Sequence, residues 1–150
     1  MIESTRSGKP QTKPGERFVY DVALRWSDLD AYGHVNNARF LTLYEEARVA
    51  MFFIGARAHG LGSFEEGIVI ARHEIDYIKP VDYGDPLRIE MWISELRAAA
   101  FTVSYEMFDD DVLASRAQSV CVPYNLANSF PRRLNDEERA FLAPYLAGSD

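Results

Sequence analysis

Hydrophobic and polar positions along the chain predict five strands and one long helix. Alternation with a period of two, or enrichment in β-forming residues, is typical of strands, and it marks residues 18–26, 68–78, 87–94, 101–107 and 112–124. In residues 40–54, apolar residues instead recur three or four positions apart, and additional apolar side chains widen this stripe. A helix with so wide an apolar face is enclosed on most of its sides.

Turn-forming residues give these segments the order strand, helix, four strands. Residues 82–86 and 109–111 are turns, and Asn135 followed by acidic residues predicts a capped C-terminal helix. Residues 1–16 lack periodicity, which predicts a flexible N-terminal tail before a single domain at 17–150. The economical packing is an α+β fold in which one long antiparallel five-stranded sheet wraps around a central helix, with a short C-terminal helix.

Composition excludes several classes of protein. A formal charge of −7 and a pI near 5.0 argue against a general nucleic-acid binder or an anionic-membrane binder. The only cysteine, Cys121, has no second thiol and no Cys/His cluster beside it, so neither a disulfide nor a metal site is expected. The sequence contains no glycine-rich nucleotide-binding loop, so no cofactor is expected. No membrane-spanning run or signal peptide is evident, which favours a cytoplasmic protein.

The turn before the helix carries the candidate chemistry. Gly33 permits a sharp bend, and Asn36 or Asn37 is a good N-cap, which predicts that the helix begins there with unpaired N–H groups. Such amides, at the positive end of the helix dipole, stabilise an oxyanion. Asp30, across the bend, could attack a carbonyl carbon or activate a water that does so. The alternative is structural: Asp28 or Asp30 caps the turn, as aspartates commonly do.

Several ordered motifs resemble one enzyme family, the hotdog-fold acyl-CoA thioesterases of the 4-hydroxybenzoyl-CoA thioesterase type. The similarity extends from about Phe18 to about Leu142. The matching segments are Asp-Leu-Asp-Ala-Tyr-Gly-His-Val-Asn-Asn at 28–37, Phe-Leu at 40–41, Glu-Glu-Ala-Arg at 45–48, Ile-Asp-Tyr-Ile-Lys-Pro at 75–80 and Tyr-Gly-Asp at 83–85.

The resemblance implies specific roles for residues in these motifs. Asp30 aligns with the family's catalytic carboxylate, and the backbone N–H of Asn37 aligns with the amide that polarises the thioester carbonyl. The Gly33-His34-Val35 stretch is expected to contact substrate. Arg97, in the connection between the third and fourth strands, matches a basic residue near the nucleotide of coenzyme A. Arg132 and Arg133 are weaker candidates for the same role.

Other residues are expected to have structural roles, and the resemblance also implies an oligomeric state. Glu45 and Arg48 match positions read as structural, where they would pair with each other or tie the helix to the sheet. His59 and His73 are also expected to be structural. Family members form homodimers or homotetramers whose sheets join edge to edge, with the acyl site between subunits. Joining exposed edge strands is one way to satisfy their free backbone groups.

The function implied is metal-free hydrolysis of an acyl-CoA thioester to a free acid and coenzyme A. Two other functions stay open: a hotdog dehydratase or hydratase that uses His34 as acid and base, and a non-catalytic module that binds acyl thioesters. Aromatic residues could line a pocket for a fatty chain or an aromatic acid, but at helical spacing they are more often core: Tyr32, Phe40, Tyr44 and Phe52. The sequence therefore leaves the acyl group undecided.

Overall fold

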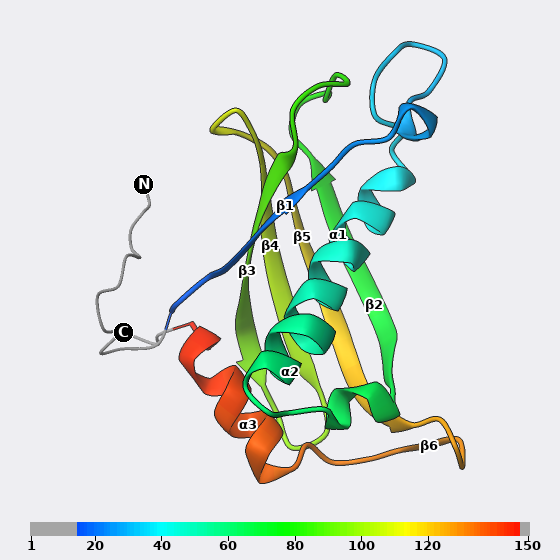
Figure 1. Ribbon diagram of the computed structural model, residues 1–150. Helices are drawn as coiled ribbons and strands as arrows, with labels where there is room; N and C mark the ends of the chain where they lie inside the picture. Colours follow the sequence, from blue (N-terminus) through cyan, green and yellow to red (C-terminus); the bar gives the residue numbers. More distant parts are fainter. Residues whose placement is uncertain (1–14, 148–150) are drawn as a thin grey trace.

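The structure, a computed structural model, describes residues 15–147 of the chain. A long antiparallel sheet curves around one central helix, and a short helix closes one end (Figure 1). This arrangement confirms the α+β hotdog fold. Residues 1–14, most of the predicted tail, lie outside the described part.

The sheet contains all five predicted strands in the order β1-β3-β4-β5-β2, and every neighbouring pair is antiparallel. Within residues 15–147, β2 pairs only with β5 and therefore forms one edge of the sheet. A short sixth strand, which the residue pattern did not predict, pairs with the end of β5. The strands are β1 Phe18–Val22, β2 Ile68–Tyr77, β3 Leu87–Leu96, β4 Phe101–Asp109, β5 Val112–Asn125 and β6 Phe130–Pro131.

The first strand is shorter than predicted, because it ends at Val22 instead of Trp26. Asp28 explains the difference. Its Oδ2 accepts a hydrogen bond from the backbone N–H of Arg25 at 2.8 Å, and its own N–H donates to the Arg25 carbonyl at 2.9 Å. These bonds fold Trp26–Asp28 into a 3₁₀ turn and direct the chain away from the sheet toward the helix.

The central helix comprises α1 Arg39–Val49, a π-helical segment Ala50–Gly55 and α2 Ala56–Ala58. It begins at Arg39 instead of the predicted Asn36 or Asn37. The reason is that Asn36 closes a separate turn ahead of the helix, where its Oδ1 accepts from Ala38 N at 2.8 Å and its carbonyl accepts from Arg39 N at 2.9 Å.

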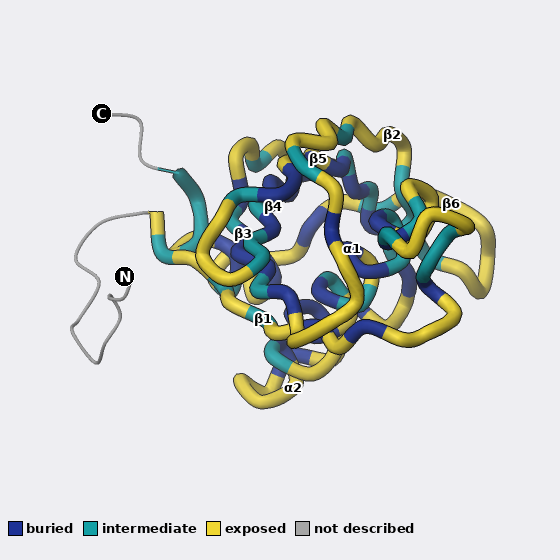
Figure 2. Tube along the Cα trace, turned by 90° about the horizontal axis from the view of Figure 1, so that it is seen from above, coloured by how far each residue is buried: buried dark blue, intermediate teal, exposed yellow. Residues whose placement is uncertain are grey.

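The hydrophobic core lies between this helix and the concave face of the sheet (Figure 2). Side chains three or four positions apart on the helix point toward the sheet, and alternate side chains of β3 and β4 pack against them. Fully buried examples are Leu43, Tyr44, Ala47 and Met51 from the helix and Leu87, Ile89, Met91, Ile93, Val103 and Tyr105 from the strands. The predicted apolar stripe faces the core, but the helix is not enclosed on most sides: Val49, Phe53 and Ile54 are 41%, 40% and 67% exposed, because the sheet covers only one side of the helix in the described chain.

The C-terminal helix α3, Asp136–Leu142, has the predicted Asn135 cap. Asn135 Oδ1 accepts from Glu138 N at 2.7 Å, and Glu138 Oε1 accepts from Asn135 N at 3.0 Å. This reciprocal arrangement is a capping box. None of the helices in residues 15–147 is both long and apolar enough to cross a bilayer.

Candidate active site

The candidate catalytic turn connects the 3₁₀ segment to α1 and is closed by backbone hydrogen bonds. Asp30 N donates to the His34 carbonyl at 2.7 Å, and Gly33 N donates to the Asp30 carbonyl at 3.1 Å. Gly33 has a φ of 83°, a left-handed conformation that glycine adopts without steric cost. Leu29 and Val35 pair at the base of the turn, so the position of Asp30 is fixed on both sides.

The Asp30 side chain is half-buried and uses one oxygen to hold the turn. Its Oδ1 accepts from Tyr32 N at 2.8 Å and from His34 N at 3.2 Å. The structural alternative is therefore real, because Asp30 does cap this turn. Its Oδ2, however, forms no hydrogen bond with any residue between 15 and 147. One oxygen orients the carboxylate, and the other remains available for chemistry.

The neighbouring Asp28 is committed to structure. Its side chain is fully buried, with Oδ2 bonded to Arg25 N. Its Oδ1 lies 3.6 Å from Arg25 Nη2 and 4.0 Å from Arg39 Nε. The Asp28 carbonyl also accepts from Asn36 N at 2.8 Å, which ties the turn to the start of the helix. Each aspartate has one carboxylate oxygen without a hydrogen bond among residues 15–147, but the Asp28 oxygen is buried, whereas the Asp30 side chain is partly exposed and can meet a substrate.

The amide of Asn37 is a free donor just before the start of α1. The N–H groups of Ala38 and Arg39 are both bonded to Asn36, whereas the Asn37 N–H has no acceptor in the described part of the chain. The Asn37 carbonyl accepts from Tyr77 Oη at 2.7 Å, and the Tyr77 ring packs on Phe40 at a centroid distance of 5.0 Å. The exposed amide thus lies at the positive end of the helix dipole.

His34 and Val35 have different surroundings. The His34 side chain is 42% exposed, and its Nε2 lies 3.5 Å from Asp82 Oδ1 in the loop after β2. Asp82 is 48 positions away in sequence, so no local pattern points to it. The Val35 side chain is buried in the core, and its N–H donates to the Val81 carbonyl at 2.7 Å. Within one chain Val35 holds the turn in place by packing.

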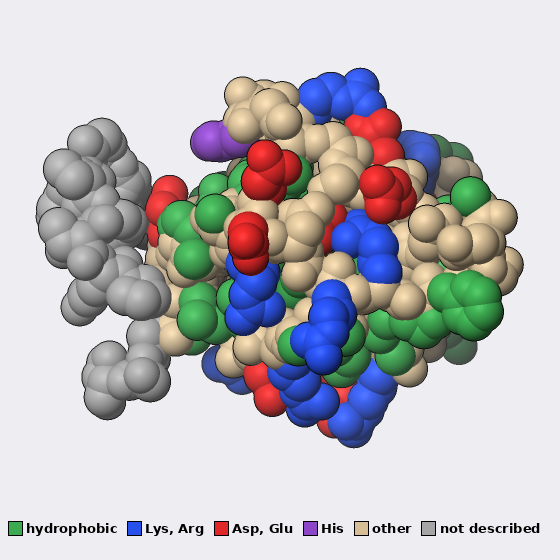
Figure 3. Space-filling view, turned by 90° about the horizontal axis from the view of Figure 1, so that it is seen from below, with side chains coloured by type: hydrophobic (Ala, Val, Ile, Leu, Met, Phe, Trp, Pro, Cys, Tyr) green, Lys and Arg blue, Asp and Glu red, His purple; other side chains and the backbone are tan. Residues whose placement is uncertain are grey.

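The β3–β4 connection, which carries Arg97, lies at the opposite end of the sheet from the segment before α1, which carries Asp30 (Figure 1). Arg97 is exposed in this connection, where its Nε donates to Glu95 at 2.9 Å and its carbonyl accepts from Arg139 at 2.8 Å. Several Lys and Arg side chains are visible on this end of the molecule (Figure 3). A single chain does not bring Arg97 and Asp30 together.

Arg132, one of the weaker phosphate candidates, is engaged inside the protein. Its side chain is only 18% exposed, and its Nη2 lies 2.8 Å from an oxygen of the fully buried Glu138. The same guanidinium donates to the Ser63 carbonyl at 3.2 Å. The side chain therefore joins the C-terminal helix to the segment before β2. Arg133 is exposed.

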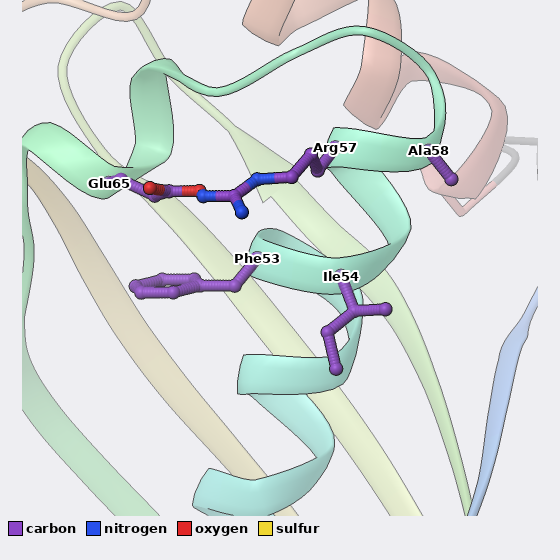
Figure 4. Close-up of a pocket in the computed structure, with 5 residues that line it drawn as sticks. All are labelled: Phe53, Ile54, Arg57, Ala58 and Glu65. Atoms are coloured by element: carbon purple, nitrogen blue, oxygen red, sulfur yellow. The ribbon is translucent and has the colours of Figure 1, made fainter.

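A cleft of about 520 Å³ opens beside the C-terminal end of the central helix (Figure 4). Phe53, Ile54 and Ala58 supply its apolar wall, and the ion pair between Arg57 and Glu65 spans one side. Phe53 and Ile54 are 40% and 67% exposed. The cleft lies at the other end of the helix from Asn37.

The arrangement at Asp30 and Asn37 suits chemistry at a carbonyl. A carboxylate with a free oxygen can deliver or activate a nucleophile, and a free amide at a helix N-terminus can stabilise the oxyanion that forms. Among the described residues, no three His, Cys, Asp or Glu side chains lie together as metal ligands would.

Comparison with known proteins identifies the family. A family model described as the thioesterase-like superfamily matches residues 24–142. A 1,4-dihydroxy-2-naphthoyl-CoA hydrolase from Synechococcus elongatus is 28% identical over 126 residues, which cover 79% of this chain and 93% of the relative. A putative esterase from Aquifex aeolicus is 25% identical over 105 residues, covering 68% of this chain and 80% of the relative.

Solved structures of thioesterases share the fold of this chain. A thioesterase from Thermus thermophilus, complexed with coenzyme A and Zn, has 29% identity and a TM-score of 0.70, covering 83% of this chain and 90% of its own. A predicted thioesterase from Bacillus stearothermophilus shares the fold with a TM-score of 0.78 at 24% identity, covering 90% and 100%. These matches confirm the predicted fold and the predicted enzyme class, a thioester hydrolase. The chain belongs to the thioesterase-like superfamily.

Proposed function

We propose that the protein hydrolyses an acyl-CoA thioester at Asp30 and Asn37. The observation that carries the proposal is the pairing of a fixed carboxylate, whose Oδ2 is free within residues 15–147, with the free N–H of Asn37 at the start of α1. Coenzyme A as the thiol is supported by the Thermus thermophilus structure that contains it and by the relative named as a CoA hydrolase.

In the proposed reaction the Asn37 N–H donates a hydrogen bond to the thioester carbonyl oxygen. Negative charge grows on this oxygen as the carbonyl carbon is attacked, so the amide binds the transition state more strongly than the substrate. Asp30 Oδ2 either attacks the carbon or removes a proton from the attacking water. The departing thiolate needs little help from an acid, because a thiol pKa is only about 8.5.

His34 and Gly33 complete the substrate side of the turn. Gly33 permits the bend because its φ of 83° is strained for other residues, although a Cβ there would meet no atom within 4 Å outside the neighbouring residues. His34 is exposed beside Asp82 and can contact the ligand. In the alternative dehydratase or hydratase function, His34 would instead act as the acid and base.

Thiol release separates the three candidate functions. Wild-type protein is mixed with a panel of acyl-CoA thioesters in the presence of a thiol-trapping dye, and the acyl products are identified by mass spectrometry. A hydrolase produces free coenzyme A and the free acid in equal amounts. Formation of a double bond without free thiol would indicate a dehydratase, and binding with no product would indicate a binding module; either result rules out the proposed reaction.

A homodimer would complete the site. The backbone groups on the free edge of β2 are available to pair with a second copy of the chain. Tyr77 and Ile78, at the end of this strand, are each 46% exposed. Antiparallel pairing of two β2 edges brings the start of one strand to the end of the other. The cleft at Phe53 and Glu65, just before β2, would then approach Asn37 of the other copy, which is bonded to Tyr77.

Light scattering and crosslinking test this dimer. We expect a mass of at least twice 17.0 kDa in solution. Arg72→Cys, near the middle of β2, should give a covalent dimer with a short bis-maleimide, because the only native cysteine in the sequence, Cys121, is buried. Val19→Cys, exposed on β1 at the other edge, is the control and should stay monomeric on denaturing gels. A monomeric wild type would contradict the prediction.

A further inference from the structure

A chain of hydrogen bonds crosses from the central helix to the edge strand β2. Arg48 Nη1 donates to Tyr105 Oη at 2.9 Å, Tyr105 Oη donates to Ser119 Oγ at 2.8 Å, and Ser119 Oγ lies 2.7 Å from His73 Nδ1. Tyr105 and Ser119 are each 1% exposed, whereas Arg48 is half-buried and His73 is exposed. The chain therefore has a buried middle and two accessible ends.

The first two hydrogen bonds of this chain run in one direction, from Arg48 through Tyr105 to Ser119. Tyr105 accepts from Arg48 and gives its own proton to Ser119. In the tautomer of His73 that lets Ser119 donate its own proton to Nδ1, the imidazole proton lies on Nε2. Burial raises the pKa of Tyr105 to about 12, which keeps it a donor. Burial and the charge of Arg48 lower the pKa of His73, although Glu45 opposes this, so the ring is neutral at neutral pH.

Both accessible ends present hydrogen-bond donors. Arg48 forms no ion pair with any carboxylate of residues 15–147, and only one of its five N–H groups is used, on Tyr105. His73 adds its Nε2–H. A half-buried guanidinium without a carboxylate partner is well suited to bind an oxygen acceptor, and its planar geometry favours more than one bond. The complementary ligand is an oxygen atom of a hydroxyl, carbonyl or carboxylate group.

The two ends lie along the path from the candidate catalytic amide. Arg48 is eleven residues after Asn37 on the same helix, about 17 Å at 1.5 Å per residue. His73 is four residues before Tyr77, about 13 Å along β2, and Tyr77 is bonded to Asn37. His73, Ile75 and Tyr77 pair with Ser119, Ala117 and Ser115, whose buried side chains face the helix. The seam between α1 and β2 therefore leads from the catalytic turn to Arg48 and His73.

We propose that Arg48 and His73 form a polar recognition point for the far end of the acyl group, so that the enzyme favours acyl groups with a terminal oxygen over plain alkyl chains of equal length. The inference rests on the proposed hydrolysis at Asp30. At roughly 1.2 Å per bond of an extended chain, the separation of about 13 Å between Tyr77 and His73 corresponds to about eleven bonds. The Arg48 side chain leans toward the start of the helix and so reaches back over part of its separation of about 17 Å from Asn37. Arg48 and His73 would determine specificity and take no part in bond cleavage.

A matched substrate pair tests the proposal. Decanoyl-CoA and 10-hydroxydecanoyl-CoA have the same length and charge and differ by one hydroxyl. We expect wild-type kcat/KM to be about tenfold higher for the hydroxylated substrate, because only that substrate pairs with the donors of Arg48 and His73. In Arg48→Met, which keeps the length of the side chain but removes its donors, the preference should fall to about twofold or less, because His73 alone is left to pair with the hydroxyl.

Controls separate the possible failures. Arg116→Met removes an exposed arginine from β5 and should keep the wild-type preference. His73→Leu, at an exposed position, tests the same prediction if Arg48→Met does not fold. A wild type that hydrolyses both substrates equally, or an Arg48→Met variant that keeps the preference, would overturn the polar recognition point while leaving the hydrolysis intact. Absence of thiol release from both substrates and from shorter acyl-CoAs would instead overturn the proposed function itself.

Discussion

The Asp30→Asn variant is expected to lose nearly all thioester hydrolysis and to keep its fold. The asparagine Oδ1 can still accept from Tyr32 N and His34 N, so the turn is preserved. The amide cannot act as a base or a nucleophile, however. Loss of such a group costs about 10²- to 10⁴-fold in rate, and we expect a fall in kcat/KM of that size. Thiol release measures the rate, and circular dichroism melting measures the fold.

Asp85→Asn provides the matched control. Asp85 is an exposed acid between β2 and β3, in the loop that also carries Asp82. The substitution removes the same charge from the same end of the molecule without touching the turn, so activity should stay at the wild-type level. If Asp30→Asn melted like the wild type and also hydrolysed thioesters at the wild-type rate, Asp30 would be a turn cap and nothing more.

Replacing Glu138 should have the largest effect on stability. This side chain is fully buried and accepts hydrogen bonds from Arg132 at 2.9 and 2.8 Å and from Ser63 at 2.6 Å. Glu138→Ala leaves the Arg132 guanidinium without its buried partner, which costs about 3–5 kcal/mol. Urea unfolding should show this loss in the free energy of unfolding. Glu137→Ala, an exposed neighbour on α3, should change it by less than about 0.5 kcal/mol.

The same carboxylate should make stability depend on acidity. Burial alone would raise the pKa of Glu138, but hydrogen bonds from Arg132, Ser63 and Asn135 lower it below its ordinary value. Its folded pKa then lies below its unfolded pKa, so its contribution is present above the unfolded pKa and is lost as the pH falls through the folded one. The stability difference between wild type and Glu138→Gln should therefore shrink below about pH 4. A constant difference would contradict this assignment.

Local patterns in the sequence predict much of the fold. Period-two alternation locates the strands because each has one face against the core, and the Asn135 cap predicts the start of α3 because its partners are only three residues away. The end of β1 is missed, since the alternation continues through Leu24 while Asp28 bends the backbone at Arg25. The helix start is missed for a similar reason, because Asn36 closes its own turn.

Contacts between residues far apart in the sequence could not be predicted from local patterns. Asp30 and Gly33 predict a tight turn from residue type alone, but the bond from Tyr77 to Asn37 and the contact between His34 and Asp82 join distant segments. Arg48 bonds to Tyr105 and so ties the helix to the sheet, one of the two roles expected for it. The Glu138 partner of Arg132 also requires the folded chain.

The most direct test of the proposed active site is a crystal structure with a nonhydrolysable acyl-CoA analogue, in which a methylene group separates the carbonyl carbon from the sulfur. We predict that the analogue's carbonyl oxygen lies within about 3.2 Å of the Asn37 N–H and that the free oxygen of Asp30 is the nearest carboxylate oxygen to its carbonyl carbon. An analogue bound with its carbonyl away from the start of α1, and with another acid beside it, would contradict the account.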